Sequence, residues 1–152
     1  MYDHPSFNEC TLSGVLTVKR KSRFYEMDFP TYDMKEIPVT DDMERAFGIR
    51  PVKAVLGLDL ICVFETEDQV RTMKPDQEML NRLEGRIQNV TAKGAETDCV
   101  SRSFCPKLMI AEDPVCGSAH CQIADYWSKE LSKREILLSC RRSWFTRWIP
   151  LN

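Results

Sequence analysis

Residues 112–120, which read EDPVCGSAH, place an acid, a thiol, a flexible turn and a hydroxyl directly before a predicted helix. Pro114 disfavours helical conformation at Asp113 and fixes its own φ angle. Gly117 lets the backbone approach a ligand closely, and Ser118 is a good N-cap. A helix N-terminus that follows such a turn offers N–H groups and a positive dipole end, which predicts a site for a carboxylate or another anion. A loop that merely turns into a core helix explains the same residues equally well.

The helix predicted to follow this turn spans residues 119–131. It carries Ala124, Trp127 and Leu131 at helical spacing. We therefore expect a central helix in which these three side chains are largely buried.

The other periodic segments indicate an α+β domain. Thr40 is a plausible N-cap and Gly48 a plausible stop for a short helix between them, and Pro75 suits the first position of another helix. The predicted helices span 41–47 and 76–83. The predicted strands span 14–20, 23–29, 52–65 (as one strand or two), 86–92, 97–104 and 135–140.

Several segments resemble one protein family. Residues 93–108 read KGAETDCVSRSFCPKL and are followed closely by EDPVCGSAHC at 112–121. Together they look like the second half of a phenazine-biosynthesis isomerase-like (PhzF-like) protein. The motif DYW at 125–127 fits the helix after the family's loop. The segments TLSGVLTV at 11–18 and MDFP at 27–30 resemble the family's passage into its second domain.

This resemblance implies a diaminopimelate epimerase-like fold, with two similar domains that each wrap a β-barrel around one helix and share a cleft between them. The chain then consists of a remnant of the inter-domain segment at 1–12, the second domain at 13–142 and a divergent tail at 143–152. No linker or repeat indicates a further boundary. A full family member is about twice as long, and its first domain supplies the principal acid/base, a glutamate. We therefore expect a fragment with half of an active site.

The resemblance also assigns roles in the loop. Asp113 occupies the family's second-domain acid position, where it contacts substrate and helps to direct proton movement. The alternative for Asp113 is an N-terminal cap, and Glu112 should point the other way along an extended segment. Ser118 lies five residues after Asp113, the spacing of the family's substrate-contacting serine. The backbone N–H groups of Gly117, Ser118 and Ala119 would bind a substrate carboxylate.

Cys116 stands where diaminopimelate epimerase has its second catalytic thiol, and the nearby helix N-terminus favours a thiolate. The isomerase-like proteins often carry threonine there and work through carboxylates. His120 and Cys121, with Cys116 and Cys105, fit no paired zinc motif, so we expect no metal. We expect no cofactor either.

These features predict a PhzF-like isomerase that acts on a small carboxylate-bearing metabolite by acid/base proton transfer. The alternatives are a thiol-based epimerase or racemase that uses Cys116, and a non-catalytic interaction domain. The partner that completes the site would be the missing first domain or a second copy of the chain.

Composition adds further expectations. The net charge of −2, with dispersed basic residues, argues against nucleic acid as a partner. No apolar run approaches the ~20 residues that span a membrane. Seven cysteines without a signal-peptide pattern predict reduced thiols and a cytoplasmic protein. We expect the apolar side chains of the tail to cover an open edge of the domain; they are Trp144, Phe145, Trp148 and Ile149.

Overall fold

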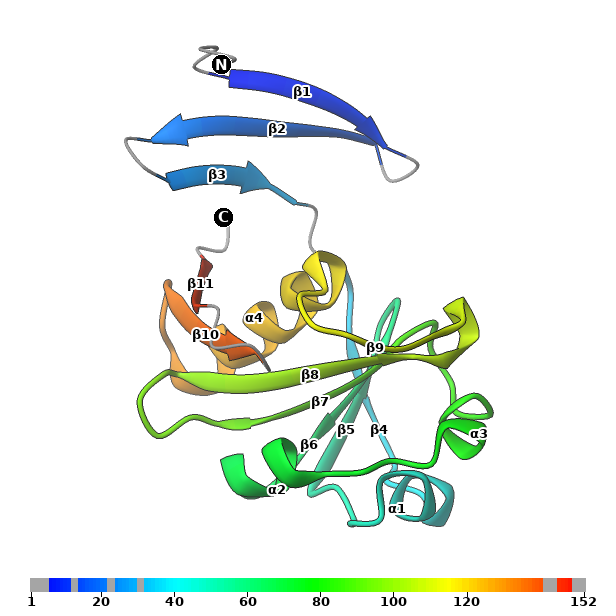
Figure 1. Cartoon of the computed structure of the whole chain (residues 1–152). Coiled ribbons are helices and arrows are strands. Elements are labelled where there is room, and N and C mark those ends of the chain that lie inside the picture. The colour runs from blue at the N-terminus through cyan, green and yellow to red at the C-terminus, as the bar shows by residue number, and fades with distance from the viewer. Residues whose placement is uncertain (1–5, 12–13, 22–23, 30–31, 141–144, 149–152) are drawn as a thin grey trace. The chain divides into compact units, whose positions relative to one another are not determined.

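The computed structural model describes residues 6–11, 14–21, 24–29, 32–140 and 145–148. The chain divides into two compact units, which are Met1–Pro30 and Thr31–Asn152. The sequence pattern indicated no boundary at Pro30, because no change of composition marks it. The first unit is an antiparallel sheet in the order β1-β2-β3 (Figure 1). Its strands are β1 (Ser6–Thr11), β2 (Gly14–Lys21) and β3 (Phe24–Asp28).

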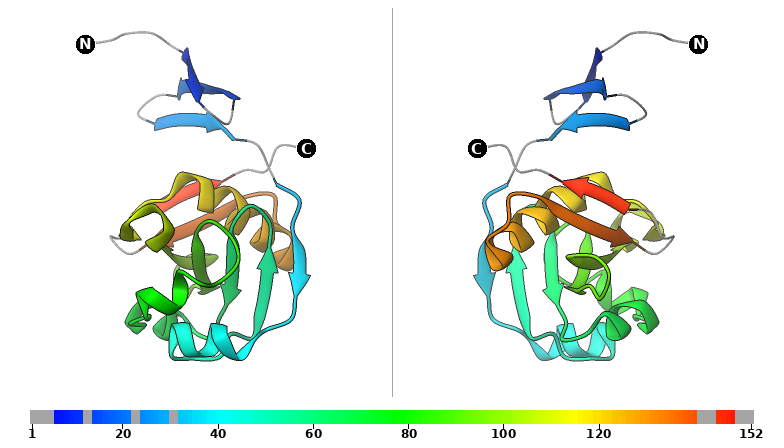
Figure 2. Two further views of the ribbon diagram at one scale, coloured as in Figure 1. Left: turned by 90° about the vertical axis from the view of Figure 1, so that its right-hand side faces the viewer. Right: turned by 90° about the vertical axis from the view of Figure 1, so that its left-hand side faces the viewer.

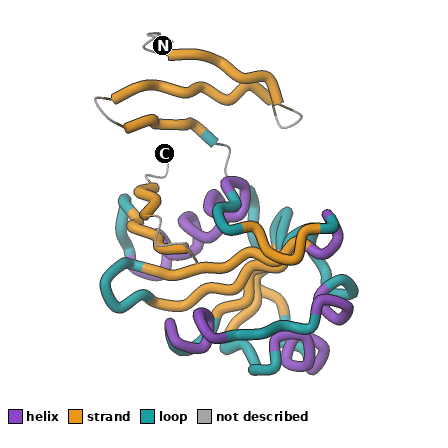
Figure 3. Tube along the Cα trace, in the orientation of Figure 1, coloured by secondary structure: helices purple, strands orange, loops and turns teal. Residues whose placement is uncertain are grey.

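The second unit contains a mixed sheet in the order β11-β10-β8-β7-β6-β5-β4, and β9 pairs with β8 beside this path. Figure 3 draws the strands in orange and the helices in purple. The strands are β4 (Lys35–Ile37), β5 (Lys53–Leu56), β6 (Leu60–Val63), β7 (Gln88–Lys93), β8 (Cys99–Cys105), β9 (Ile110–Asp113), β10 (Ile136–Cys140) and β11 (Phe145–Trp148). The helices are α1 (Asp41–Phe47), α2 (Glu67–Thr72), α3 (Gln77–Leu80), the 3-10 turn η1 (Pro106–Leu108) and α4 (Gly117–Leu131). The predicted α+β class is confirmed.

Side chains of the central strands alternate between two hydrophobic cores, as the pleat of a β-strand requires. In β6, Leu60 and Cys62 pack with side chains of α1, α2 and α3, whereas Ile61 and Val63 pack with side chains of α4. The sheet of the second unit therefore has helices on both faces (Figure 2). The continuous apolar run of β6 is the sequence signature of a strand buried on both sides.

A helix lies where one was predicted, because α4 includes residues 119–131 and begins two residues before them. Ala124 is fully buried and Trp127 is nearly so, while Leu131 in the last turn is half-buried. The Trp127 indole Nε1 donates a hydrogen bond of 2.9 Å to Thr91 Oγ1, which fastens the helix to β7. Neither α4 nor any other helix in the described residues has the length and apolarity that crossing a membrane requires.

Helix α1 has the predicted ends. The Thr40 side chain accepts a hydrogen bond from the Met43 N–H at 3.3 Å, and Gly48 closes the helix with φ +73°. The apolar segment 52–65 forms two strands, β5 and β6, which pair as an antiparallel hairpin.

Two other helices differ from the sequence-based prediction. Pro75 is not the first residue of α3, because Asp76 caps this helix by accepting hydrogen bonds from two backbone N–H groups. The short helix α2 was missed. Its signal was a capping box, in which the Thr66 hydroxyl accepts from the Gln69 N–H and the Gln69 side chain accepts from the Thr66 N–H.

Part of the divergent tail extends the sheet. Strand β11 runs antiparallel to β10, with Ile136 opposite Trp148 and Ser139 opposite Phe145. Trp144 and Ile149 lie outside the described residues, as do the side chains of Phe145 and Trp148. The tail backbone thus adds a strand beside β10, and burial of its apolar side chains stays a prediction.

Gly85 in the turn before β7 offers a test of this packing. Gly48 (φ +73°) and Gly85 (φ +77°) both adopt left-handed conformations, but a Cβ atom at Gly48 meets nothing within 4 Å. A Cβ atom at Gly85 would lie 2.4 Å from the backbone nitrogen of Leu60. We expect Gly48→Ala to lower the free energy of unfolding by about 1–2 kcal/mol. Gly85→Ala should cost about 1–3 kcal/mol more, because the clash adds to the strain. Equal losses in urea unfolding would contradict this packing.

Candidate active site at the start of helix α4

Strand β9, which carries the candidate acid, is held by a buried ion pair. Arg102 Nε and Nη2 donate to the two carboxylate oxygens of Glu112 at 2.8 and 2.9 Å, and both side chains are about nine-tenths buried. Arg102 Nη1 also donates to the carbonyl oxygens of Met73 (2.7 Å) and Val70 (3.0 Å). These contacts join β8 and β9 to the region of α2. Glu112 thus has a structural role.

Asp113 is the last residue of β9 and is half-buried. It lies opposite Ser103 of β8 in the strand register, while its neighbour Glu112 pairs with Arg102, so the two acids point in opposite directions as predicted. Asp113 Oδ1 accepts a hydrogen bond of 2.9 Å from the Val115 N–H. The carboxylate therefore closes the turn that leads into α4, which is a local role close to the capping alternative.

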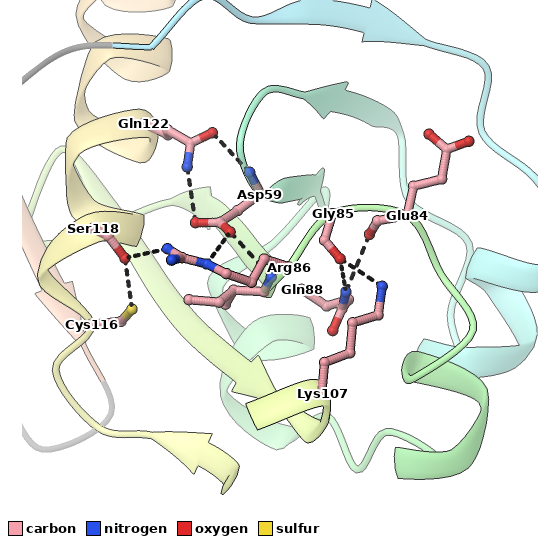
Figure 4. Close-up of polar contacts among 10 residues, drawn as sticks. Asp59, Glu84, Gly85, Arg86, Gln88, Lys107, Cys116, Ser118 and Gln122 are labelled. Atoms are coloured by element: carbon pink, nitrogen blue, oxygen red, sulfur yellow. Dashed lines mark hydrogen bonds and ion pairs between the residues drawn. The ribbon is translucent and has the colours of Figure 1, made fainter. Parts of the chain in front are cut away.

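Helix α4 begins at Gly117, two residues earlier than it would if Ser118 were its N-cap. Cys116 occupies the N-cap position in extended conformation, and the first backbone bond runs from the His120 N–H to Cys116 O at 3.1 Å. The prediction that Ser118 caps the helix was wrong. The physical reason is that its hydroxyl has other contacts: Arg86 Nη2 donates to Ser118 Oγ at 3.4 Å, and Cys116 Sγ lies 3.6 Å from the same oxygen (Figure 4).

The Cys116 thiol lies in surroundings that favour its ionised form. A hydrogen bond from Cys105, with further ones from the Ser118 hydroxyl and the Ala119 N–H, lowers the pKa of Cys116 to about 7, although burial and the charge of Asp113 oppose the shift. The same thiol–thiol contact, together with burial, raises the pKa of Cys105. The Ala119 N–H, one of the three predicted anion donors, thus also serves the sulfur. Cys105, considered in the sequence only as a metal ligand, is its hydrogen-bond partner.

The neighbouring titratable side chains differ from Cys116. Burial raises the pKa of Cys121 to about 12, and its Sγ donates to Gly117 O at 3.2 Å. Burial also lowers the pKa of His120 to about 4, so its imidazole is neutral near pH 7. Within the described residues, no three His, Cys, Asp or Glu side chains are arranged to hold a metal ion.

A second polar cluster at the start of α4 was missed by the sequence analysis. Asp59, in the turn between β5 and β6, is fully buried. Gln122 Nε2 donates to Asp59 Oδ2 at 3.0 Å, and the Asp59 N–H donates to Gln122 Oε1 at 3.2 Å. Arg86 Nε lies 3.6 Å from Asp59 Oδ1 and reaches Ser118 with its outer nitrogen (Figure 4). The signal available in the sequence was that Asp59 and Gln122 each interrupt an otherwise apolar segment.

The second unit is an α+β domain with an acid–turn–helix loop, which agrees with the resemblance to the second half of a PhzF-like protein. Residues 6–139 match the family described as "Phenazine biosynthesis-like protein". The chain belongs to this family, which confirms the resemblance. It is 39% identical over 136 residues to an uncharacterized isomerase of Pseudomonas aeruginosa, covering 88% of this chain and 52% of that protein. It is 33% identical to an uncharacterized isomerase of Halalkalibacterium halodurans, covering 84% of this chain and 49% of that protein.

Solved structures agree with this assignment. A PhzF-family protein of Enterococcus faecalis matches 99% of this chain and 59% of its own, with a TM-score of 0.93 and 36% identity. A putative phenazine biosynthesis PhzC/PhzF protein of Clostridium difficile matches 90% of this chain and 52% of its own, with a TM-score of 0.81 and 36% identity. The chain spans about half the length of the curated relatives it matches.

Glu112→Gln tests the ion pair that holds β9. The substitution leaves the Arg102 guanidinium buried without an anion, so we expect the free energy of unfolding to fall by about 3–5 kcal/mol. Asp42→Asn is the matched control, because Asp42 pairs with Arg45 at an exposed surface and should contribute less than about 1 kcal/mol. Denaturant unfolding measures both. A loss at Glu112 as small as that at Asp42 would contradict the proposed role.

Alkylation tests the state of the thiols. Iodoacetamide reacts with thiolates, so its rate at Cys116 should rise with pH to a midpoint near 7. Cys121, whose pKa is raised to about 12, should stay unmodified under the same conditions. Peptide mass spectrometry resolves the two sites, and Cys116→Ser should abolish the fast phase. Equal rates at both cysteines would show that the surroundings of Cys116 do not favour its thiolate.

Proposed function

We propose that this chain provides one half of the active site of an isomerase that moves a proton between positions of a small carboxylate-bearing metabolite. Asp113 accepts a hydrogen bond from a substrate amine or hydroxyl, and Ser118 with the N–H groups of Gly117 and Ala119 binds the substrate carboxylate. The principal acid/base, a glutamate by resemblance, comes from the family's first domain. No cofactor takes part. General acid–base catalysis of this kind contributes typically ~10²–10⁴ in rate.

The observation that supports this proposal is the loop geometry. The Asp113 carboxylate closes the turn by accepting the Val115 N–H, and Ser118 follows in the first turn of α4. An acid and a serine are thus presented together at a helix N-terminus, where the macrodipole favours a substrate anion. The reaction class is supported by relatives that are named isomerases, one of which is 39% identical to this chain. Burial of α4 over residues 119–127 fits the family's barrel around one helix.

A thiol-based epimerase or racemase is a second candidate, and one observation favours it. The pKa of Cys116 is lowered to about 7, which suits a group that must both take and give a proton near neutral pH. In this version Cys116, rather than Asp113, exchanges the proton with the substrate carbon.

Ligand titration tests the binding half of the proposal in the 152-residue chain. We expect acetate, the minimal anion, and serine, which adds an amine and a hydroxyl, to shift the amide NMR signals of residues 117–119. Asp113→Asn should weaken serine binding about tenfold or more by removing a charged hydrogen-bond acceptor, with little effect on acetate. Ser118→Ala should weaken both.

Asp68→Asn, at an exposed position in the first turn of α2, is the matched control and should change neither titration. Acetate that leaves the signals of residues 117–119 unmoved would overturn the proposed carboxylate site. To separate the two candidates, solvent deuterium exchange into substrate carbon is measured on the chain combined with its completing domain. Loss of exchange in Cys116→Ser but not in Asp113→Asn would favour the epimerase.

A further inference from the structure

Arg86 lies beside the candidate site on a turn whose backbone is closely held. The preceding Gly85 has φ +77°, and a Cβ atom there would lie 2.4 Å from the backbone nitrogen of Leu60. The Arg86 N–H donates to Leu58 O at 3.4 Å. Lys107 Nζ donates to Gly85 O at 2.6 Å (Figure 4). These contacts fix the position of the Arg86 backbone, from which its side chain extends.

A buried carboxylate then directs the guanidinium. Asp59 is fully buried, and its Oδ1 accepts from the Ile87 N–H at 3.1 Å while Oδ2 accepts from Gln122 Nε2 at 3.0 Å. Arg86 Nε lies 3.6 Å from the same Oδ1. Burial raises the pKa of Asp59, and the charge of Arg86 counteracts that shift. The Ile87 N–H and Gln122 Nε2 thus fix the carboxylate independently of Arg86, and the fixed carboxylate orients the guanidinium.

The outer end of the guanidinium decides how Ser118 uses its hydroxyl. Arg86 Nη2 lies 3.4 Å from Ser118 Oγ, and a guanidinium can only donate. Ser118 Oγ is therefore the acceptor in this contact, and its hydrogen is available for a different partner. Cys116 Sγ, 3.6 Å from Ser118 Oγ, is such a partner. Hydrogen bonds thus run from Arg86 to Ser118 and from Ser118 to Cys116, and the ion pair with Asp59 holds the Arg86 end.

We propose that Arg86 is a positioning residue, which makes the Ser118 hydroxyl a hydrogen-bond donor toward Cys116 in the free site and toward the substrate anion in the occupied one. The second half of this statement rests on the proposed function, whereas the first half concerns the free protein alone. No sequence motif of the loop points to Arg86, because it lies 32 residues before Ser118.

Other groups also act on the Cys116 sulfur. Cys105 from β8 and the Ala119 N–H favour its thiolate, while Asp113 from β9 disfavours it. His120 on α4 is neutral near pH 7. The contribution of Arg86 to the pKa of Cys116 must therefore be measured by substituting Arg86 both with and without the Ser118 hydroxyl present.

The test is the pH profile of Cys116 alkylation by iodoacetamide in four forms of the chain: wild type, Arg86→Gln, Ser118→Ala and the double variant. We expect Arg86→Gln and Ser118→Ala each to raise the midpoint by about 0.5–1 pH unit, the value of one hydrogen bond. The double variant should shift no further than Ser118→Ala alone. Arg86→Lys should restore part of the shift, since lysine also only donates.

Two controls keep the result interpretable. Arg82→Gln, at an exposed arginine before the same turn, should leave the midpoint unchanged. Asp59→Asn combined with Arg86→Gln avoids leaving a buried carboxylate without its cation, so it should remain folded and still show the raised midpoint. A wild-type midpoint in Arg86→Gln would overturn the proposal. So would an equal shift in the Ser118→Ala background, because Arg86 would then act by its charge alone. Alkylation needs no substrate, so failure of the acetate and serine titrations leaves this result unaffected.

Discussion

The bidentate ion pair between Arg102 and Glu112 joins β8 to β9 in the interior of the second unit. The guanidinium also donates to the backbone carbonyl oxygens of Val70 and Met73, so that this one side chain of β8 binds partners in both β9 and the region of α2. A buried guanidinium needs this full set of acceptors, because an unpaired charge in the interior is strongly destabilising. β9 is short and paired only with β8 among the described strands, so this ion pair fixes where it ends. Asp113 and the turn into α4 follow directly from that point.

Helix α4 combines two requirements that usually conflict. Its middle is buried among apolar side chains of the sheet, and the Trp127–Thr91 hydrogen bond fixes it in place. Its first turn holds polar groups that a purely structural helix would not need. The cost of burying them is met by mutual contacts: Cys116 with Cys105 and Ser118, Ser118 with Arg86. The same hydrogen bonds that satisfy these polar groups also determine their protonation.

The thiol and the carboxylate at this site bear on different reactions. Asp113 agrees with the carboxylate chemistry that the family resemblance implies, while the low pKa of Cys116 suits proton transfer by a thiol. The two side chains are electrostatically coupled, since the charge of Asp113 disfavours the Cys116 thiolate. A change of either one therefore alters the other. The chain spans about half the length of the curated relatives it matches. In the function proposed above, groups from the family's first domain would decide between the two reactions.

Local signals in the sequence were sufficient for several features. The Thr40 cap and the Gly48 stop of α1, the burial of α4 and the opposite directions of Glu112 and Asp113 follow from backbone geometry over a few residues. The loop motif was also sufficient for the family. By contrast, the capping position at α4 required knowledge of the neighbours of Ser118.

Only the tertiary structure brought Asp59 and Arg86 to the first turns of α4, where Asp59 contacts Gln122, and only it placed Cys105 against Cys116. These partners are far apart in the chain or on different elements, and no periodicity or motif links them. A thiol pKa or the direction of a hydroxyl depends on atoms within a few ångströms. The sequence alone therefore determined which residues stand in the loop and which helix follows it. The fold decided which charges and donors surround them, because side-chain chemistry is set by contacts across the sheet.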